Sequence, residues 1–129
     1  MKIILALVAA AVLSVASFAS DKSTSLLDAQ AAIEANLKTP EGKAFDEQAG
    51  NDIVKNHLAP LRACKSADGG NLTDFWILLK LGKDGNVEEL LFHPTTKLAD
   101  CARDGLMKEK FLAPPRPEYW ISVYIKWSH

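Results

Sequence analysis

The residues that could do chemistry in this chain of 129 residues are few and scattered. Its three histidines, His57, His93 and His129, lie far apart, and none belongs to an HExxH or comparable metal-ligand pattern. No GxSxG elbow frames a serine nucleophile. Glu88 and Glu89 are adjacent in a strand-like run, where neighbouring side chains point to opposite faces and cannot share acid–base work. We therefore predict that the protein is not an enzyme and has no metal site and no cofactor.

Cys64 and Cys101 are the two cysteines, and they offer a different chemistry. Isolated thiols without CxxC spacing make a poor metal or redox pair. In an exported protein an even number of cysteines is typical of a disulfide. The bond would close a loop of about 37 residues, worth roughly 4 kcal/mol if it acts by restricting the unfolded chain. We therefore predict a disulfide between Cys64 and Cys101.

Residues 1–19 have the layout of a secretory signal peptide. Lys2 supplies a positive start, residues 3–13 are all apolar, and Ser17 and Ala19 place small side chains before a cleavage site after Ala19. An uncleaved membrane anchor is the alternative, but the apolar run is shorter than the roughly 20 residues that a span needs. We predict export to the periplasm, or secretion, by a bacterial cell, with no membrane insertion after the signal peptide is removed.

The charge of the chain is nearly balanced. It has 15 basic and 16 acidic residues and a formal net charge of −1. Such a chain has no general attraction for phosphate backbones or anionic lipid. We therefore predict no nucleic-acid partner.

Two helices are predicted in the N-terminal segment, residues 20–63. Apolar residues recur at steps of three and four over 25–38, which indicates an amphipathic helix. Thr39 as the N-cap and Pro40 at the first helical position begin a second helix, whose apolar spacing continues towards Cys64. Pro60 should kink or end this helix, because it lacks an amide donor.

Three strand-like segments and one further helix follow. Residues 75–81 are apolar on both faces, which is typical of a central strand. Gly85 and its neighbours have the composition of a hairpin turn, so 87–93 should return antiparallel. A helix over 95–110 then crosses to a last strand, 119–127, and an all-antiparallel sheet requires the first strand in the middle and the last at an edge. The predicted fold class is α+β: a three-stranded antiparallel sheet (β-β-α-β) with two N-terminal helices packed on it and one disulfide.

The helix over 95–110 positions the second cysteine. Its predicted buried face consists of Leu98, Cys101, Ala102 and Leu106. Cys101 should therefore point inward and meet the end of the second helix at Cys64, which would tie the helical segment to the sheet.

An ordered set of motifs runs from Cys64 to Trp127. The turn Asp84-Gly85-Asn86-Val87 is followed by the strand end and helix opening of 93–102, by Phe111 with Pro114 and Pro115, and by a closing strand, 121–125. In this order the motifs resemble the C-terminal domain of TonB and the related domains of gliding-motility-type proteins. Cysteines before the first strand and in the helix resemble the cysteine-bearing branch. The resemblance implies a non-catalytic module over 64–129 that grips a short partner segment at the edge of its sheet.

The last strand is the predicted partner-binding element. An edge strand leaves backbone amide and carbonyl groups unpaired, and an extended peptide can complete the ladder there. One face of this strand forms the candidate partner surface: Trp120, Ser122, Tyr124 and Lys126. The alternative is that Trp120 and Tyr124 pack under the N-terminal helices. The exposed edge would also permit a homodimer by strand pairing.

These observations support two hypotheses for function. The first is an exported, non-catalytic periplasmic protein that binds a protein or peptide partner at the edge of its sheet. The alternative is a small secreted inhibitor or immunity protein that blocks a hydrolase, with contacts from the loops 65–71 and 111–118. A single exported domain held by one disulfide suits either role.

Overall fold

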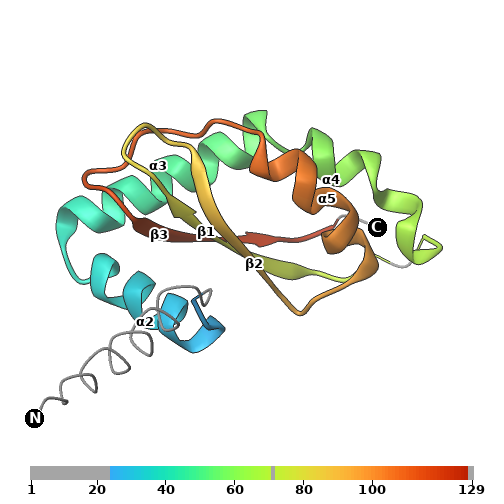
Figure 1. Cartoon of the computed structure of the whole chain (residues 1–129), viewed down its shortest axis with the longest axis horizontal. Coiled ribbons are helices and arrows are strands. Elements are labelled where there is room, and N and C mark those ends of the chain that lie inside the picture. The colour runs from blue at the N-terminus through green and yellow to red at the C-terminus, as the bar shows by residue number, and fades with distance from the viewer. Residues whose placement is uncertain (1–23, 71, 128–129) are drawn as a thin grey trace, which may run out of the picture.

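A three-stranded antiparallel sheet lies between two layers of helices in the computed structural model, which describes residues 24–70 and 72–127 (Figure 1). Its strands are β1 (Phe75–Leu81), β2 (Val87–His93) and β3 (Tyr119–Ile125), in the order β2-β1-β3. Both outer strands pair antiparallel with β1. The predicted α+β class and the central position of the first strand are therefore confirmed. The predicted signal peptide and its cleavage site lie outside the described residues.

Three of the four α-helices of the described residues begin at a capping side chain. The four helices are α2 (Leu26–Leu37), α3 (Pro40–Asn56), α4 (Ala59–Ala63) and α5 (Lys97–Met107), with a 3₁₀ turn, η3 (Lys65–Asp68), after α4. Ser25, Thr39 and Thr96 each accept a backbone N–H with the side-chain hydroxyl at a helix start, which stabilises the first turn. The predicted second helix divides into α3 and α4, because Pro60 begins a new helix where its missing amide is tolerated.

Three boundaries differ from the prediction. The helix predicted to reach residue 110 ends at Met107. The segment 65–71, predicted as a loop, begins with the 3₁₀ turn η3. The last strand ends at Ile125 rather than Trp127. The backbone N–H of Trp127 donates to Asp74 Oδ1 at 2.9 Å, so a side chain takes the amide that would have continued the ladder.

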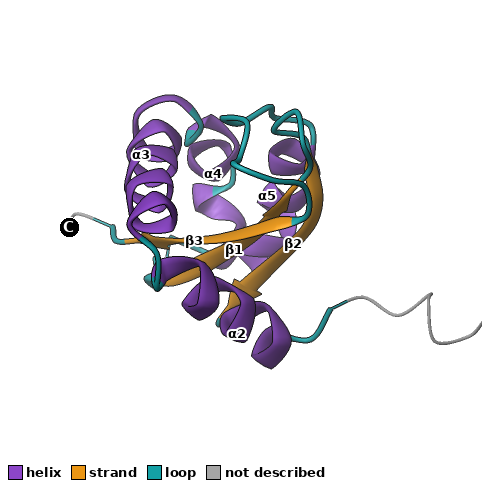
Figure 2. Cartoon of the chain, turned by 90° about the vertical axis from the view of Figure 1, so that its left-hand side faces the viewer, coloured by secondary structure: helices purple, strands orange, loops and turns teal. Residues whose placement is uncertain are grey.

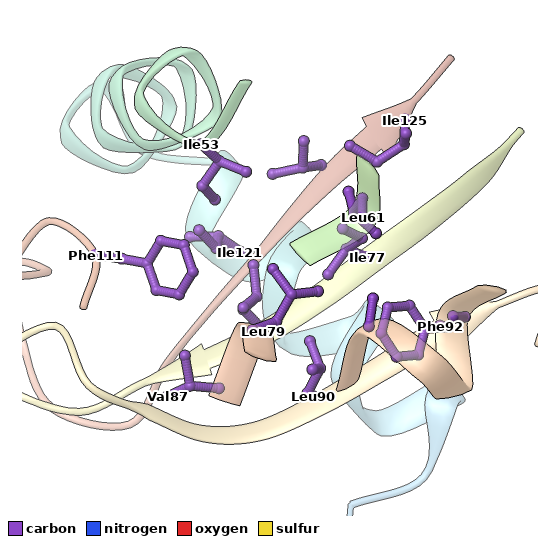
Figure 3. Packing of buried hydrophobic residues seen from close by; sticks show 14 of the residues in the cluster. Ile53, Leu61, Ile77, Leu79, Val87, Leu90, Phe92, Phe111, Ile121 and Ile125 are labelled. Atoms are coloured by element: carbon purple, nitrogen blue, oxygen red, sulfur yellow. The ribbon is translucent and has the colours of Figure 1, made fainter. Parts of the chain in front are cut away.

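The two faces of the sheet carry different numbers of helices. α2 lies on one face, and α3, α4 and α5 lie on the other (Figure 2). The face under α3, α4 and α5 holds the larger core, which includes Ile53, Leu61, Ile77, Leu79, Phe92 and Ile121 (Figure 3). The face under α2 holds a smaller cluster of Ala29, Ile33, Leu78 and Trp120. β1 is apolar on both faces because alternate side chains enter these two cores.

The hairpin between β1 and β2 turns at Gly85, which has φ 90°. Glycine adopts this conformation without the steric cost that a Cβ brings. The backbone N–H of Phe111 donates to the carbonyl oxygen of Gly85 at 2.9 Å, and Asn86 pairs with Lys110 in an isolated bridge. A Cβ at Gly85 would lie 2.1 Å from the carbonyl oxygen of Phe111. The turn therefore reverses the chain and also holds the segment that follows α5.

The predicted disulfide between Cys64 and Cys101 is present. It links the end of α4 to α5 over a sequence separation of 37 residues, with the Cα atoms 5.9 Å apart. The prediction that Cys101 belongs to the buried face of α5 is wrong, because Cys101 is exposed and Ala99 is buried in its place. Cys101 lies at the border of the buried stripe, from where its sulfur reaches the buried Cys64.

Replacing Gly85 should test the turn. We expect Gly85→Ala to lower the free energy of unfolding by at least about 2 kcal/mol, because alanine is strained at this φ and its Cβ meets a backbone oxygen. Gly50→Ala is the matched control: Gly50 lies within α3 with no heavy atom near its added Cβ. It should raise stability by about 0.5–1 kcal/mol. Denaturant unfolding that gives both variants the same sign of change would contradict this account of the turn.

Removing the disulfide should destabilise the protein without changing its sheet. The double variant Cys64→Ser/Cys101→Ser frees a loop of 37 residues in the unfolded chain, and we expect a loss of about 2–4 kcal/mol. Urea unfolding of the variant, compared with the oxidised and the reduced parent, measures the loss. A parent whose midpoint does not move on reduction would contradict a stabilising role for this bond.

Candidate functional site

The four predicted partner-binding residues differ in exposure. Trp120, Ser122 and Tyr124 alternate along β3 on the α2 side of the sheet, and Lys126 follows the strand. Trp120 is 6% exposed and packs against α2, whereas Tyr124 is 46% exposed. Ser122 is half-buried and Lys126 is exposed. Trp120 therefore packs under an N-terminal helix, which was one of the two alternatives for this pair. Tyr124 stays exposed to solvent, as the other alternative expects.

The outward backbone groups of β3 are partly occupied by side chains from the helices. Asn36 Nδ2 donates to the carbonyl oxygen of Trp120 at 3.1 Å. Burial raises the pKa of Asp46, and a hydrogen bond from the backbone of Ser122 partly offsets this rise. Within the described residues no comparable bond reaches the outward groups of Tyr124. The end of β3 at Tyr124 is therefore the part of this edge that remains open to an added strand.

An exposed aromatic pair lies at the same end of the sheet. The register places Trp76 of β1 directly between His93 of β2 and Tyr124 of β3. The Trp76 and Tyr124 rings are in contact, with centroids 4.9 Å apart and planes inclined by 47°. Trp76 is 43% exposed. Two large aromatic side chains that are adjacent and exposed form the kind of patch that soluble proteins use for binding.

An open groove of about 310 Å³ lies between Trp76 of this pair and α2. We call it the aromatic groove, and its lining residues are Gln30, Ile33, Glu34, Trp76, Leu78, His93 and Ser122. Apolar side chains form part of its wall, and amide, carboxylate, imidazole and hydroxyl groups lie around them. Such a mixture suits a ligand that is apolar in part and is oriented by a few hydrogen bonds.

The aromatic groove exists because α2 crosses only part of the sheet. Just before α2, Thr24 donates from its N–H and its hydroxyl to the carboxylate of Glu89 on β2, at 2.8 and 3.0 Å. Near the other end of α2, Asn36 bonds to Trp120 on β3. The helix therefore runs from β2 to β3 (Figure 2). It covers the row that contains Glu89 and Trp120 and leaves the row of Trp76 uncovered.

A charged pair fixes the β2 end of α2. Lys80 Nζ lies 3.0 Å from Glu89 Oε2, across the β1–β2 ladder. Burial tends to raise the pKa of Glu89, but the bonds from Thr24 and the ion pair with Lys80 outweigh it, so the pKa is lowered. The same hydrogen bond between Lys80 and Glu89 raises the pKa of Lys80. Both shifts favour the charged forms that hold α2 on the sheet.

The histidines of the described residues have separate environments. Nδ1 of His57 lies 2.7 Å from Glu109 Oε1, and its Nε2 lies 3.1 Å from Asp52 Oδ2. His93 is exposed at the aromatic groove. Over residues 24–70 and 72–127 no cluster of side chains suited to a metal ion is found.

Sequence reasoning found Tyr124 but missed Trp76, His93 and the contribution of α2. The signal for Trp76 and His93 was available in part. The hairpin turn at Gly85 indicates which residues of the two strands face each other, and counting back from it pairs position 76 with position 92. The bulge at Glu88 shifts this partner by one residue, to His93. The α2 side of the groove had no such signal, because Gln30 and Glu34 reach the sheet through tertiary packing.

We expect the Glu89 carboxylate to make stability depend on pH. Because its pKa is lowered in the folded state, its contribution is complete above the ordinary glutamate pKa and is lost as pH falls through the lowered value. Glu89→Gln should lose about 1 kcal/mol at neutral pH. It should also show a flatter decline in the free energy of unfolding between about pH 5 and pH 3 than the parent. Glu88→Gln, an exposed neighbour, is the control; equal slopes for Glu89→Gln and the parent would refute the assignment.

Comparison with protein families, curated proteins and solved structures finds no match to this chain. The resemblance to TonB C-terminal domains therefore remains a prediction from the order of the motifs. In the described part of the chain, no helix has the length and apolar character needed to cross a membrane.

Proposed function

We propose that this protein is an exported, non-catalytic binding module that holds a segment of a partner protein at the aromatic groove and the adjacent end of β3. The observation that carries the proposal is the contact pair of Trp76 and Tyr124, each more than two-fifths exposed beside an open groove. Large aromatic side chains in this arrangement supply much of the binding energy at protein interfaces. The predicted signal peptide supports export.

A partner segment can use side-chain and backbone contacts at the same time. An apolar side chain of the partner would cover the faces of Trp76 and Tyr124 and lose contact with water. Its backbone would pair with the outward groups of β3 beyond Ser122, which the helices leave open. Gln30, Glu34 and His93 line the groove and can orient the segment by hydrogen bonds.

The predicted family resemblance points to the same mode of action. It implies a module that grips a short segment at the edge of its sheet, and the strand order β2-β1-β3 leaves β3 at an edge. Asn36 donates a hydrogen bond to the backbone of Trp120, and Asp46 accepts one from the backbone of Ser122. The end of the edge near Tyr124 is therefore the part available for an added strand. The exposed aromatic pair and the available backbone groups therefore adjoin each other.

Site-specific crosslinking in the producing cell tests the proposal. A photo-reactive phenylalanine analogue at position 124 should capture a partner protein, whereas the same analogue at Val54, an exposed site on α3, should not capture it. Peptides from the captured segment should then shift the backbone resonances of Tyr124 and the indole resonance of Trp76.

Trp76→Ala should weaken the binding of these peptides by at least about tenfold, and Val54→Ala should leave it unchanged. Circular dichroism and unfolding curves of both variants control for the fold. Equal crosslinking from positions 124 and 54, or binding that is insensitive to Trp76→Ala, would contradict the proposed function.

A further inference from the structure

A second surface lies on the opposite edge of the sheet, between β2 and α5. It is an open groove of about 440 Å³, which we call the β2–α5 groove. Its lining residues are Glu88, Glu89, Leu90 and Leu91 of β2 with Arg103, Asp104 and Met107 of α5. The residues from α5 recur at steps of one, three and four, so they lie on one side of that helix. This groove shares no lining residue with the aromatic groove.

The outer edge of β2 borders this groove. Nη1 of Arg103 donates to the carbonyl oxygen of Leu90 at 2.8 Å, so the backbone groups of Leu90 point away from β1. Because the groups of an antiparallel strand alternate in direction, those of Phe92 point outward as well. Glu88 is the extra residue of a bulge, since Lys80 pairs with Glu89 and Leu81 with Val87. Among these outward groups of the described residues, the carbonyl of Leu90 is therefore held by a side chain of α5.

The charges of the β2–α5 groove favour a basic occupant. Glu88 and Asp104 are exposed carboxylates, and Glu89 is already neutralised by Lys80. The single cation of the lining, Arg103, is engaged with Leu90 and lies over the Phe92 ring at 5.1 Å. Met107 adds an apolar surface that is 38% exposed. A lysine or arginine side chain, with an apolar stem and a positive head, matches this combination.

We propose that the β2–α5 groove binds an extended, basic segment of another protein as a fourth strand of the sheet. A backbone N–H of the segment replaces the Arg103 guanidinium at the carbonyl oxygen of Leu90. Alternate side chains of the segment then lie along α5, where their stems cover Met107 and their positive heads meet Glu88 and Asp104. A second copy of this chain fits less well, because pairing β2 with β2 would bring two acidic grooves together.

Synthetic peptides of defined charge test this inference on the full-length mature protein. A capped peptide of alternating lysine and valine should shift the amide resonances of Leu90 and Phe92 and the methyl resonance of Met107, with saturation in the micromolar to millimolar range. A peptide of alternating glutamate and valine should cause no such shifts. An N-methylated form of the lysine peptide, which cannot donate along one side, should lose binding because the ladder cannot form.

Three protein variants separate the contributions. Glu88→Gln/Asp104→Asn should weaken the binding of the lysine peptide by about tenfold at low salt. Glu47→Gln, which removes an exposed acid on α3, should leave this binding unchanged. Arg103→Met should bind the peptide more tightly than the parent, because a methionine side chain has no N–H to donate to the carbonyl of Leu90.

Several outcomes would overturn the inference. They are equal binding of the glutamate peptide, shifts confined to β3, unchanged affinity in Glu88→Gln/Asp104→Asn, or a concentration-dependent dimer whose contacts map to β2. The last result would show that a second copy of the chain occupies this edge. Because the readout lies on β2 and α5, none of these outcomes depends on the proposed role of the aromatic groove.

Discussion

The register of the β1–β2 hairpin is the constraint on which the other features of this protein depend. The turn at Gly85, with φ 90°, and the bulge at Glu88 together place Trp76 opposite His93 and Lys80 opposite Glu89. A slip of one residue would move every side chain of a strand to the other face of the sheet. Trp76 would then leave the aromatic groove and enter the main core, and Glu89 would lose Lys80. The turn and the bulge thus underlie both the exposed aromatic pair and the attachment of α2.

The second determinant is the placement of α2, which is fixed by polar contacts at both ends. Thr24 binds Glu89 at the β2 side, and Asn36 binds the backbone of Trp120 at the β3 side. Between these contacts the helix buries Trp120 under its apolar face. A helix held in this direction crosses the strands rather than following them, so it covers a band of the sheet and leaves Trp76 and Tyr124 exposed. The open aromatic surface is therefore a consequence of how α2 is attached.

Local features of the fold could be predicted from the sequence, and long-range ones could not. The caps at Ser25 and Thr39, the hairpin at Gly85 and the disulfide each depend on residue type and spacing within a short segment or on a single pair of cysteines. The face chosen by α2 had no such signal, because an apolar stripe only requires some apolar surface opposite it. For the same reason alternation placed Trp120 and Tyr124 on one face but could not say that α2 would bury only Trp120.

The two edges of the sheet are protected by different means, and this difference decides what each can bind. On β3, side chains from α2 and α3 occupy the backbone groups at Trp120 and Ser122, so the edge is open at one end and next to aromatic rings. On β2, the bulge at Glu88 and the Arg103 guanidinium at the carbonyl of Leu90 obstruct the edge. The carboxylates of Glu88 and Asp104 lie beside it. A bulge and a charged side chain are common devices against unwanted strand pairing. Arg103 can leave the carbonyl of Leu90 by a change of side-chain rotamer, so the β2 edge can become available without a change in the fold. On the two proposals above, an apolar segment would gain most from the aromatic end of β3 and a basic segment from β2, so one type of segment would not compete effectively for both edges.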